Sequence, residues 1–307
     1  MIAAVCNRYG PPEVLQLRDV ATPAPGRGDL LVRIHAAAVT VSDTYIRSAV
    51  PSASLRTRAM LRVFIGLTRP RRPILGAVLA GEIEKVGRRV ARFRAGDHVY
   101  AFTTVRFGCY AQFASVPERS IVARAPSNFR HDEAAAIPYG GLIALYFLRM
   151  GSIQAGQRVL VYGASGAIGT AALQLAKHFG AHVTAVCSTA NIELVRSLGA
   201  DAVLDYTKDR IPEGECYSFV LDAVGRRKTS ALKADSRNAL TPDGKYVSVD
   251  DRLPRVRAQD LSFLTELAES RKITSVIDRQ YPLERIAEAH RYVEEGHKRG
   301  NVIIALP

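Results

Sequence analysis

The sequence predicts an α/β protein with a β-rich part and a second part built on a parallel sheet with crossover helices. In the first hundred residues, short apolar or alternating runs are separated by glycine and proline, which is typical of strands. Between residues 130 and 250, apolar runs alternate with helical segments through short connections, which indicates parallel strands. The glycine-rich stretch VYGASGAIG (161–169) joins the first of these strands to its helix.

The β-rich part is expected to contain strands at 30–39, 80–87, 97–102 and 110–116. Residues 51–73 interrupt the pattern, and we expect a long excursion there with a short helix at 55–65.

In the second part, residues 132–151 predict a helix that is interrupted near Pro138. The following elements are expected in order: strand 158–162, a helix, strand 182–187, helix 190–198, strands 202–206 and 218–224, helix 228–240 and strand 245–250. The chain then predicts helices at 259–271 and 283–295, a strand at 273–278 and a last strand at 301–306.

The composition favours a globular protein in a reducing compartment. The chain has 307 residues, which is long enough for about two domains. Hydrophobic residues make up 48% of it and charged residues 23%, as is ordinary for a globular protein. No apolar run reaches the roughly 18–20 residues of a membrane span, and no basic segment precedes an apolar one at the start. The four cysteines are scattered without metal-binding spacing. We therefore expect a cytoplasmic protein without a membrane partner.

The net charge of +13 has a local source. Ten arginines fall between residues 56 and 94, and such a cluster is compatible with a nucleic-acid surface. The alternative is a solvated face that attracts anionic ligands. No nucleic-acid motif accompanies the charge, so we expect no nucleic-acid partner.

The glycine-rich stretch predicts a dinucleotide site. The helix behind it places six apolar side chains on one face, namely Ile168, Ala171, Ala172, Leu175, Ala176 and Phe179. Glycines permit a tight turn, and the helix N-terminus attracts a pyrophosphate. The residues assigned to this site are Gly163, Ala164, Ser165, Gly166, Ala167, Ile168 and Gly169. The alternative is a glycine turn that only packs the helix on the strand.

The end of the second strand indicates which dinucleotide binds. An NAD site normally has an acidic residue there that bonds the ribose 2′-OH. Here the strand ends in Cys187, Ser188 and Thr189, which include no carboxylate and offer hydroxyls to a 2′-phosphate. The sequence therefore favours NADP(H) over NAD(H).

The chain resembles the medium-chain dehydrogenase/reductases, and within them the zinc-free quinone oxidoreductase branch. The motifs that carry the resemblance span nearly the whole chain: GPPEVLQL (10–17), SDTYIRS (42–48), PILGAVLAGEIEKVG (73–87), GDHVYAF (96–102), AAAIPYGGLIAL (134–145), GASGAIG (163–169), STANIELVRSLGADAVLDY (188–206), DAVG (222–225) and GHKRGNVIIAL (296–306).

This resemblance implies two domains and a hydride-transfer reaction. A GroES-like β-rich domain is expected over 1–123 and 273–307, with a Rossmann domain over 124–272 between them. The active site is expected in the cleft, where hydride passes from NADPH to a quinone, an enone or another activated double bond of a small molecule. Many relatives are homodimers.

The positions of the zinc ligands argue against a metal. Zinc-dependent relatives carry Cys, His and Glu where this chain has Thr40, Ala77 and Val78, and the four-cysteine loop is missing. These side chains offer zinc no ligand set.

The resemblance also assigns roles to single residues. Tyr45 is the candidate donor to a developing oxyanion, with a core or rim aromatic as its alternative, and Thr40 is a weaker donor. Asp43 and Arg47 are expected to anchor the loop, and His35 to be structural. The residues implied on the cofactor side are Ala223, Val224 and Gly225 at the nicotinamide ribose, Tyr206 at the adenine, Ser188 and Thr189 at the 2′-phosphate, and Lys208, Arg210 or Arg299 as sources of charge.

Several positions depart from the family pattern. Thr40, Val78, Ile143 and Ala190 replace Asn, Asp, Thr and a basic residue of relatives. After Asp251, only RLPRVRAQ stands where relatives have roughly 40–50 residues, a length within the domain-size range. The Rossmann sheet is therefore expected to be truncated at one edge, which argues against the usual dimer.

Two functions follow from these observations. One is a zinc-independent, NADPH-dependent reductase of quinones or α,β-unsaturated carbonyls. The other is a non-catalytic NADP(H)-binding or interaction protein with the same fold. The sequence does not name the substrate.

Overall fold

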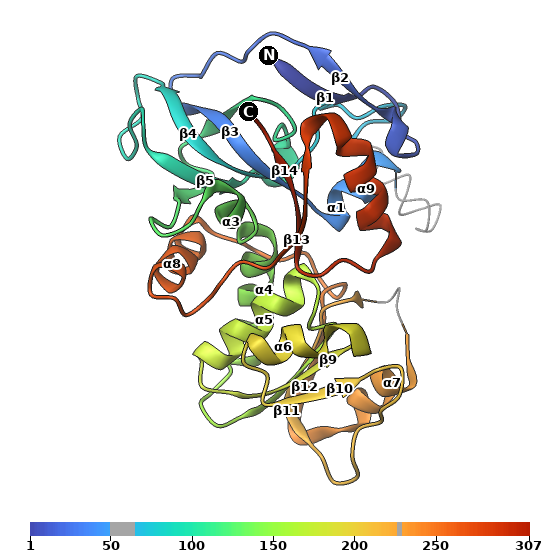
Figure 1. Cartoon of the computed structure of the whole chain (residues 1–307). Helices are drawn as coiled ribbons and strands as arrows, with labels where there is room; N and C mark the ends of the chain where they lie inside the picture. The colour runs from blue at the N-terminus through green and yellow to red at the C-terminus, as the bar shows by residue number, and fades with distance from the viewer. Residues whose placement is uncertain (50–64, 226–228) are drawn as a thin grey trace. The chain divides into compact units, whose positions relative to one another are not determined.

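The computed structural model describes residues 1–49, 65–225 and 229–307, which divide into two compact units. Unit 1 comprises Met1–Pro138 and Ile277–Pro307, and unit 2 comprises Tyr139–Val276. Both chain ends belong to unit 1 (Figure 1). The predicted α/β fold class is confirmed. The first boundary falls later than the predicted residue 123, because helix α3 (His131–Ala135) packs on strands of unit 1. The second falls later than the predicted residue 272, at Ile277, where strand β13 (Ile277–Pro282) begins.

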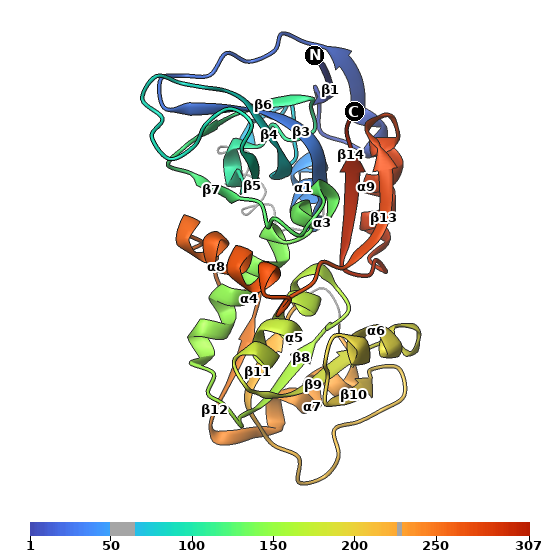
Figure 2. The same ribbon diagram turned by 60° about the vertical axis from the view of Figure 1, so that its left-hand side comes forward.

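Unit 1 contains a seven-stranded sheet in the order β13-β14-β3-β4-β5-β7, with β6 paired to β3. These strands are β3 (Asp29–Val39), β4 (Val78–Val86), β5 (His98–Phe102), β6 (Phe113–Pro117), β7 (Ile121–Arg124), β13 (Ile277–Pro282) and β14 (Asn301–Ala305). Strands β13 and β14 lie side by side and run parallel, as Figure 2 shows, whereas the other pairs are antiparallel. A separate two-stranded sheet consists of β1 (Ile2–Cys6) and β2 (Leu15–Asp19).

The core of unit 1 explains its almost continuous apolar strands. Strand β3 is buried along most of its length, including Leu30, Val32 and Ile34 at 0% exposure. Burial of each such side chain stabilises the fold by about 1.5–3 kcal/mol. The described part of unit 1 also contains helices α1 (Val41–Arg47), α3 and α9 (Ile286–Glu295) and the short turns η1 (Pro12–Val14), η2 (Thr104–Arg106) and η5 (Leu283–Arg285).

The β-rich part differs from the prediction in several elements. Strands β1, β2 and β7 and helix α1 were not predicted, and the strand expected at 273–278 lies at Ile277–Pro282. Strand β13 is displaced because it pairs with β14, and this pairing is not visible in the local sequence. The helix expected at 55–65 falls almost wholly outside the described residues.

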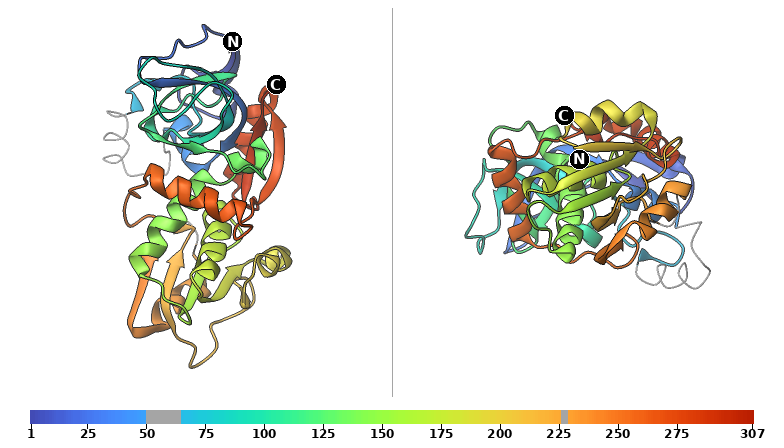
Figure 3. Two further views of the ribbon diagram at one scale, coloured as in Figure 1. Left: turned by 90° about the vertical axis from the view of Figure 1, so that its left-hand side faces the viewer. Right: turned by 90° about the horizontal axis from the view of Figure 1, so that it is seen from below.

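Unit 2 contains a five-stranded parallel sheet in the order β10-β9-β8-β11-β12, as the alternating pattern predicted. Its strands are β8 (Arg158–Tyr162), β9 (His182–Cys187), β10 (Ala202–Asp205), β11 (Tyr217–Asp222) and β12 (Leu240–Ser248). Its helices are α4 (Pro138–Gly151), α5 (Ala167–His178), α6 (Ile192–Ser197), α7 (Ala231–Asn238) and α8 (Ala258–Glu269), with a turn η3 (Thr189–Asn191). Figure 3 shows α8 beside α4, and Arg149 of α4 pairs with Asp260 of α8.

The parallel sheet ends at β12, as the expected truncation requires. Residues 249–257 lead from β12 to α8 without forming a further strand. The edge strand contains Pro242 and Gly244, and its pairing with β11 shifts register between Tyr217 and Phe219. Proline, glycine and irregular pairing all discourage the addition of another strand.

One helical stretch of the described residues, His131–Gly151, is long and apolar enough to cross a membrane. Of the most apolar 18-residue window of this stretch, 72% is buried inside the protein, so the stretch is only weak evidence for a membrane span. This stretch corresponds to α3 and α4, which break near Pro138 as predicted.

Candidate functional site

The glycine turn after β8 has a shape that side chains would prevent. Gly163 has φ +80°, and a Cβ at Gly169 would lie 2.1 Å from the carbonyl oxygen of Gly163. The N–H groups of Gly163 and Ala164 donate to Val186 O at 3.0 and 2.9 Å, and Gly166 N–H donates to Gly163 O. The backbone N–H groups of these three residues are therefore bonded within the turn, and they fix its shape.

The N-terminus of α5 has no side-chain cap. Its N-cap residue is Gly166, and the first backbone bond of the helix runs from Thr170 N to Gly166 O at 2.8 Å. The N–H groups of Ala167, Ile168 and Gly169 precede that bond and have no acceptor in the helix. An uncapped helix start with three such amides fits a phosphate group.

The loop after β11 lies against the same turn. A Cβ at Gly163 would come within 2.3 Å of Val224 Cγ1, so Val224 contacts the glycine turn directly. Gly225 has φ +68°, a backbone conformation that favours glycine. The structure thus brings together the two predicted groups, Gly163–Gly169 and Ala223–Gly225.

A buried carboxylate holds that loop, and the sequence analysis did not identify it. Asp222 is 1% exposed, and its Oδ1 accepts the N–H groups of Val224 and Gly225 at 3.2 and 3.1 Å. Its Oδ2 accepts from the Tyr246 hydroxyl, the Ser248 hydroxyl and Lys233 Nζ, the last at 2.8 Å. Lys233 also donates to the carbonyl of Gly225. A polar residue at the end of an apolar strand was the available signal.

The hydroxyls predicted to hold a 2′-phosphate follow β9. Thr189 donates its proton to Asp205, so Thr189 Oγ1 is left as an acceptor. Asn191 Nδ2 donates to Ser188 Oγ and to Ser165 Oγ, both at 3.2 Å, which leaves both serine protons for another partner. The Oδ1 atom of Asn191 is buried without a hydrogen-bond partner among the described residues.

The other cofactor-side candidates are more dispersed. Tyr206 follows β10, is 38% exposed, and its ring centroid lies 6.4 Å from that of Tyr162. Lys208 Nζ lies 4.0 Å from Asp205, and Arg210 pairs with Asp235 of α7. Arg299 belongs to unit 1, where its N–H donates to Asp278. The roles of these residues toward a cofactor stay predictions.

In unit 1, Thr40 and Asp43 close the N-terminus of α1. The Thr40 hydroxyl donates to Asp43 Oδ2 at 2.7 Å, and Asp43 N–H donates back to Thr40 Oγ1 at 3.3 Å. Thr40 therefore offers no proton to a substrate while this bond persists. Burial raises the pKa of Asp43 to about 6, against hydrogen bonds from Thr40 that lower it. Tyr45 is half-buried on the same helix, and its catalytic role stays a prediction.

Arg47 anchors the end of α1. Its side chain is fully buried, and its guanidinium donates to Gly10 O, to Glu294 and, at 3.3 Å, to His290 Nδ1. Burial, and next the charge of Arg47, lower the pKa of His290 to about 3. Its Nε2 atom has no hydrogen-bond partner among the described residues. Arg47 and Asp43 thus hold the two ends of α1, and their role at a functional site stays a prediction.

His35 belongs to a cluster of three histidines in unit 1. Its ring stacks on His131 with centroids 4.5 Å apart, and His98 Nδ1 lies 2.9 Å from His131 Nε2. Burial, followed by the charges of the other two histidines, lowers the pKa of His131. The stacked rings fit the structural role expected of His35.

The three positions compared above with zinc ligands of relatives offer no ligand set in this chain, and zinc independence stays a prediction. The positions of zinc ligands in relatives are occupied by Thr40, Ala77 and Val78, of which only the first has a polar side chain. In the described part of the chain, no group of three or more His, Cys, Asp or Glu residues has a metal-binding arrangement.

The arginine cluster is exposed where the structure describes it. Seven of its members have exposed side chains: Arg69, Arg71, Arg72, Arg88, Arg89, Arg92 and Arg94. Arg92 pairs with Glu118, and Arg94 pairs with Asp97. These pairs fit the interpretation as a solvated face.

Comparisons with known proteins decide the family. The family model of the alcohol dehydrogenase GroES-like domain matches residues 26–127, and two models described as zinc-binding dehydrogenase match 167–277 and 251–304. The chain is 30% identical over 353 aligned positions to NAD(P)H oxidoreductase RTN4IP1, mitochondrial, of Bos taurus, covering 99% of this chain and 89% of the relative. The chain belongs to the medium-chain dehydrogenase/reductase superfamily, in its quinone oxidoreductase branch.

Further relatives agree with this family. The chain is 31% identical to NADPH-dependent alkenal/one oxidoreductase, chloroplastic, of Arabidopsis thaliana over 324 positions, covering 99% of this chain and 79% of the relative. A quinone oxidoreductase structure from Coxiella burnetii has a TM-score of 0.87 at 24% identity, covers 100% and 99% of the two chains, and supports the fold alone. The 353 positions aligned with the bovine relative exceed the 307 residues of this chain, so that relative has segments missing here.

Proposed function

We propose that this protein is an NAD(P)H oxidoreductase, specifically a zinc-independent reductase that uses NADPH to reduce a quinone or an α,β-unsaturated carbonyl. The observation that carries the proposal is the uncapped start of α5 behind a turn that only glycine fits. NADPH, when bound, supplies the hydride. The names of the relatives support a nicotinamide cofactor and a small-molecule substrate.

The chain's own residues would hold and orient the cofactor. The amides of Ala167, Ile168 and Gly169 would receive the pyrophosphate. Asp222 would fix the Ala223–Gly225 loop beside the nicotinamide ribose, because two backbone N–H groups of that loop are bonded to its carboxylate.

NADPH is preferred in this proposal because of Ser188 and its neighbour Asn191. Asn191 donates to Ser188 Oγ, so the Ser188 proton is available to a 2′-phosphate. Thr189 is a weaker partner, because its proton goes to Asp205 and its oxygen can only accept. An NADH preference would require Thr189 to accept from the ribose 2′-OH.

On the substrate side, Tyr45 would donate a hydrogen bond to the developing oxyanion, which stabilises it without a metal ion. Solvent would supply the proton to the reduced product. The four cysteines are free, with Cys216 exposed, which supports a reducing compartment such as the cytoplasm as the proposed location.

The second candidate is a non-catalytic NADP(H)-binding protein. The specific observation in its favour is the Thr40 hydroxyl, whose only proton is donated to Asp43. Tyr45 then remains as the predicted side-chain donor of this segment.

The test is fluorescence titration with NADPH and NADH, followed by cofactor oxidation with 9,10-phenanthrenequinone and with a simple enone. We expect tighter binding of NADPH and turnover of at least one acceptor. Tyr45→Phe should lower kcat by a factor of about 10²–10³, the usual effect of losing one oxyanion donor, without changing the NADPH Kd. Binding without turnover would favour the second candidate, and binding of neither nucleotide would reject both.

A further inference from the structure

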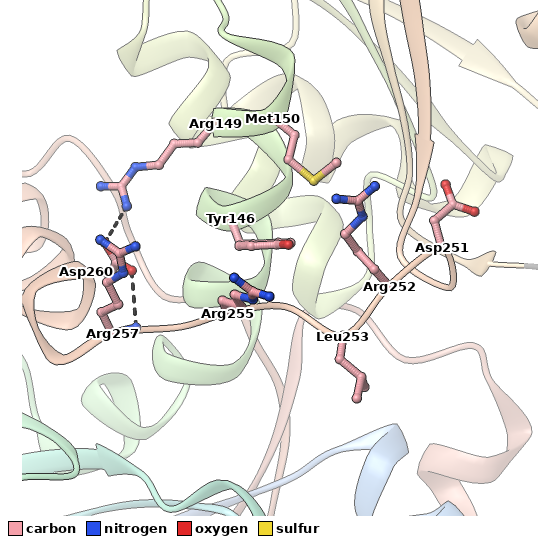
Figure 4. A pocket seen from close by; sticks show the side chains of 9 residues that line it. All are labelled: Tyr146, Arg149, Met150, Asp251, Arg252, Leu253, Arg255, Arg257 and Asp260. Atoms are coloured by element: carbon pink, nitrogen blue, oxygen red, sulfur yellow. Dashed lines mark hydrogen bonds and ion pairs between the residues drawn. The ribbon is translucent and has the colours of Figure 1, made fainter.

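A cavity lies at the edge of unit 2 where the parallel sheet ends. Its volume is about 780 Å³, and its walls come from the C-terminal half of α4, the segment 251–257 and the start of α8. The lining residues, all labelled in Figure 4, are Tyr146, Arg149, Met150, Asp251, Arg252, Leu253, Arg255, Arg257 and Asp260. The cavity exists because residues 251–257 pass along α4 without adding a sixth strand to the sheet.

The side chains that line this cavity carry more positive than negative charge. Arg149 is paired with Asp260, which also accepts the N–H of Arg257 at 3.2 Å. Asp251 accepts from Ser248 N–H at 2.8 Å. Over residues 1–49, 65–225 and 229–307, no hydrogen bond or ion pair is formed by the guanidinium group of Arg252, Arg255 or Arg257. The cavity therefore has three guanidinium groups without a partner in the described chain, and the proposal concerns those of Arg252 and Arg255.

The opposite wall is apolar and firmly placed. Tyr146 is half-buried and packs edge-on against Phe147, with ring centroids 5.2 Å apart. Phe147 and Leu148 have no exposed surface, so α4 cannot turn to withdraw Tyr146 and Met150 from the cavity. Figure 4 shows Arg252 and Arg255 reaching from the segment 251–257 toward these two side chains, whereas Leu253 points away.

This combination selects a class of ligand. Planar guanidinium groups bind phosphate oxygens in pairs, and an arginine also stacks on an aromatic ring. A phosphate monoester carries a charge of about −1.5 to −2 at neutral pH, which matches two unpartnered arginines better than a carboxylate does. Tyr146 and Met150 would contact the organic part of the ligand.

The cavity is separate from the dinucleotide site. The glycine turn follows β8, whereas the cavity begins after β12, and β11 lies between these two strands. Its residues form none of the hydrogen bonds of the glycine turn and none to Asp222 itself. The nearest link is Asp251, which accepts from the N–H of Ser248, a residue whose hydroxyl donates to Asp222.

We propose that this cavity binds a small organic phosphate with an aromatic or apolar body, held by Arg252 and Arg255 against Tyr146 and Met150. The site belongs to the shortened edge of the sheet and does not depend on the proposed reductase activity.

The probe is phenyl phosphate, titrated calorimetrically into the full chain with and without saturating NADPH. We expect one site per chain, weaker binding of inorganic phosphate, no binding of phenol, and no change with NADPH. The variant Arg252→Gln/Arg255→Gln should bind at least about tenfold more weakly, because hydrogen bonds to charged groups are lost. The control Arg119→Gln removes an exposed arginine of unit 1 and should bind normally.

Three results would overturn the proposal. They are absence of phenyl phosphate binding at millimolar concentration, unchanged binding by Arg252→Gln/Arg255→Gln, and displacement of phenyl phosphate by NADPH, which would place it in the dinucleotide site. Thermal unfolding of each variant checks the fold, and exposed arginines should change it little. If NADPH itself does not bind, the reductase proposal fails while the titration without NADPH still decides this one.

Discussion

Asp43 of unit 1 and Asp222 of unit 2 are both 1% exposed, but their surroundings differ. Asp222 has Lys233 Nζ at 2.8 Å, and both its carboxylate oxygens accept hydrogen bonds. Asp43 has only the hydroxyl and N–H of Thr40 on Oδ2, and its Oδ1 has no hydrogen-bond partner among the described residues. The comparison shows that one buried carboxylate is stabilised by a cation and the other bears most of its desolvation cost.

The two helix starts differ in the same way. The start of α1 is closed by Thr40 and Asp43, whereas the start of α5 at Gly166 has no side-chain cap. A closed start gives local stability, and an open start leaves N–H groups for a ligand. In unit 1 the buried carboxylate of Asp43 therefore fixes the start of a helix. In unit 2 the buried carboxylate of Asp222 fixes a loop that lies beside the uncapped start of α5.

The largest effect is expected from Lys233→Met, which leaves Asp222 buried without its cation. The free energy of unfolding should fall by about 3–5 kcal/mol. Urea denaturation followed by circular dichroism measures the change. The control Arg210→Gln breaks the exposed pair with Asp235 of the same helix α7 and should cost about 0–1 kcal/mol. Equal losses in the two variants would show that Lys233 does not stabilise Asp222.

The next effect concerns the pH dependence of stability through Asp43. Its folded pKa of about 6 exceeds the unfolded value of about 3.9. This contribution to stability is therefore full below about pH 4 and is lost as the pH rises through about 6. The difference of about two pKa units corresponds to about 3 kcal/mol.

Asp43→Asn removes the pH-dependent contribution of Asp43 to the free energy of unfolding. The contribution of His290, which has the opposite pH dependence, then remains. The pKa of His290 is lowered to about 3, so its contribution is present above the unfolded pKa of about 6.5 and is lost as the pH falls toward 3. Relative to wild type, the variant should lose about 3 kcal/mol more between pH 7 and pH 4. Urea unfolding at several pH values checks this, with Asp19→Asn on the surface as control. Parallel pH profiles would contradict the prediction.

Gly169→Ala is expected to lower the free energy of unfolding less than the preceding variants and to weaken NADPH binding. The added Cβ would meet Gly163 O at 2.1 Å, and such overpacking costs about 1–3 kcal/mol. Because the turn must shift, the NADPH Kd should rise at least about tenfold, the factor that 1.4 kcal/mol represents. Gly166→Ala is the matched control, since its Cβ would meet only Gly163 O at 3.7 Å. Fluorescence titration compares both variants with the wild type, and a Gly169→Ala affinity equal to the wild-type value would exclude a role for this turn.

The smallest effect is expected from Thr40→Ala, which opens the start of α1. Loss of an N-cap hydroxyl lowers the free energy of unfolding by about 1 kcal/mol. Thr40→Ser keeps the hydroxyl and should retain most of this stability. Thermal unfolding of the two variants measures the difference, and a stable Thr40→Ala variant would mean that the cap contributes nothing.

The α/β class, the alternation of β8 to β12 with helices, and the glycine turn could be predicted from the order of the amino acids. These features depend on local periodicity and on glycines whose positive φ or close contacts exclude side chains. The shortened edge after Asp251 was also predicted, because the connecting segment is too short for a further strand and helix. These predictions required only neighbours along the chain.

Which polar groups meet across long separations in the chain depends on how the elements pack in three dimensions. Lys233 reaches Asp222 from the following helix, Arg47 meets His290 and Glu294 near the other end of the chain, and Thr189 gives its proton to Asp205. The cavity with Arg252 and Arg255 likewise requires the packing of α4 against the segment 251–257. Hydrogen bonds and ion pairs act over a few ångströms in space, so sequence spacing alone cannot assign them.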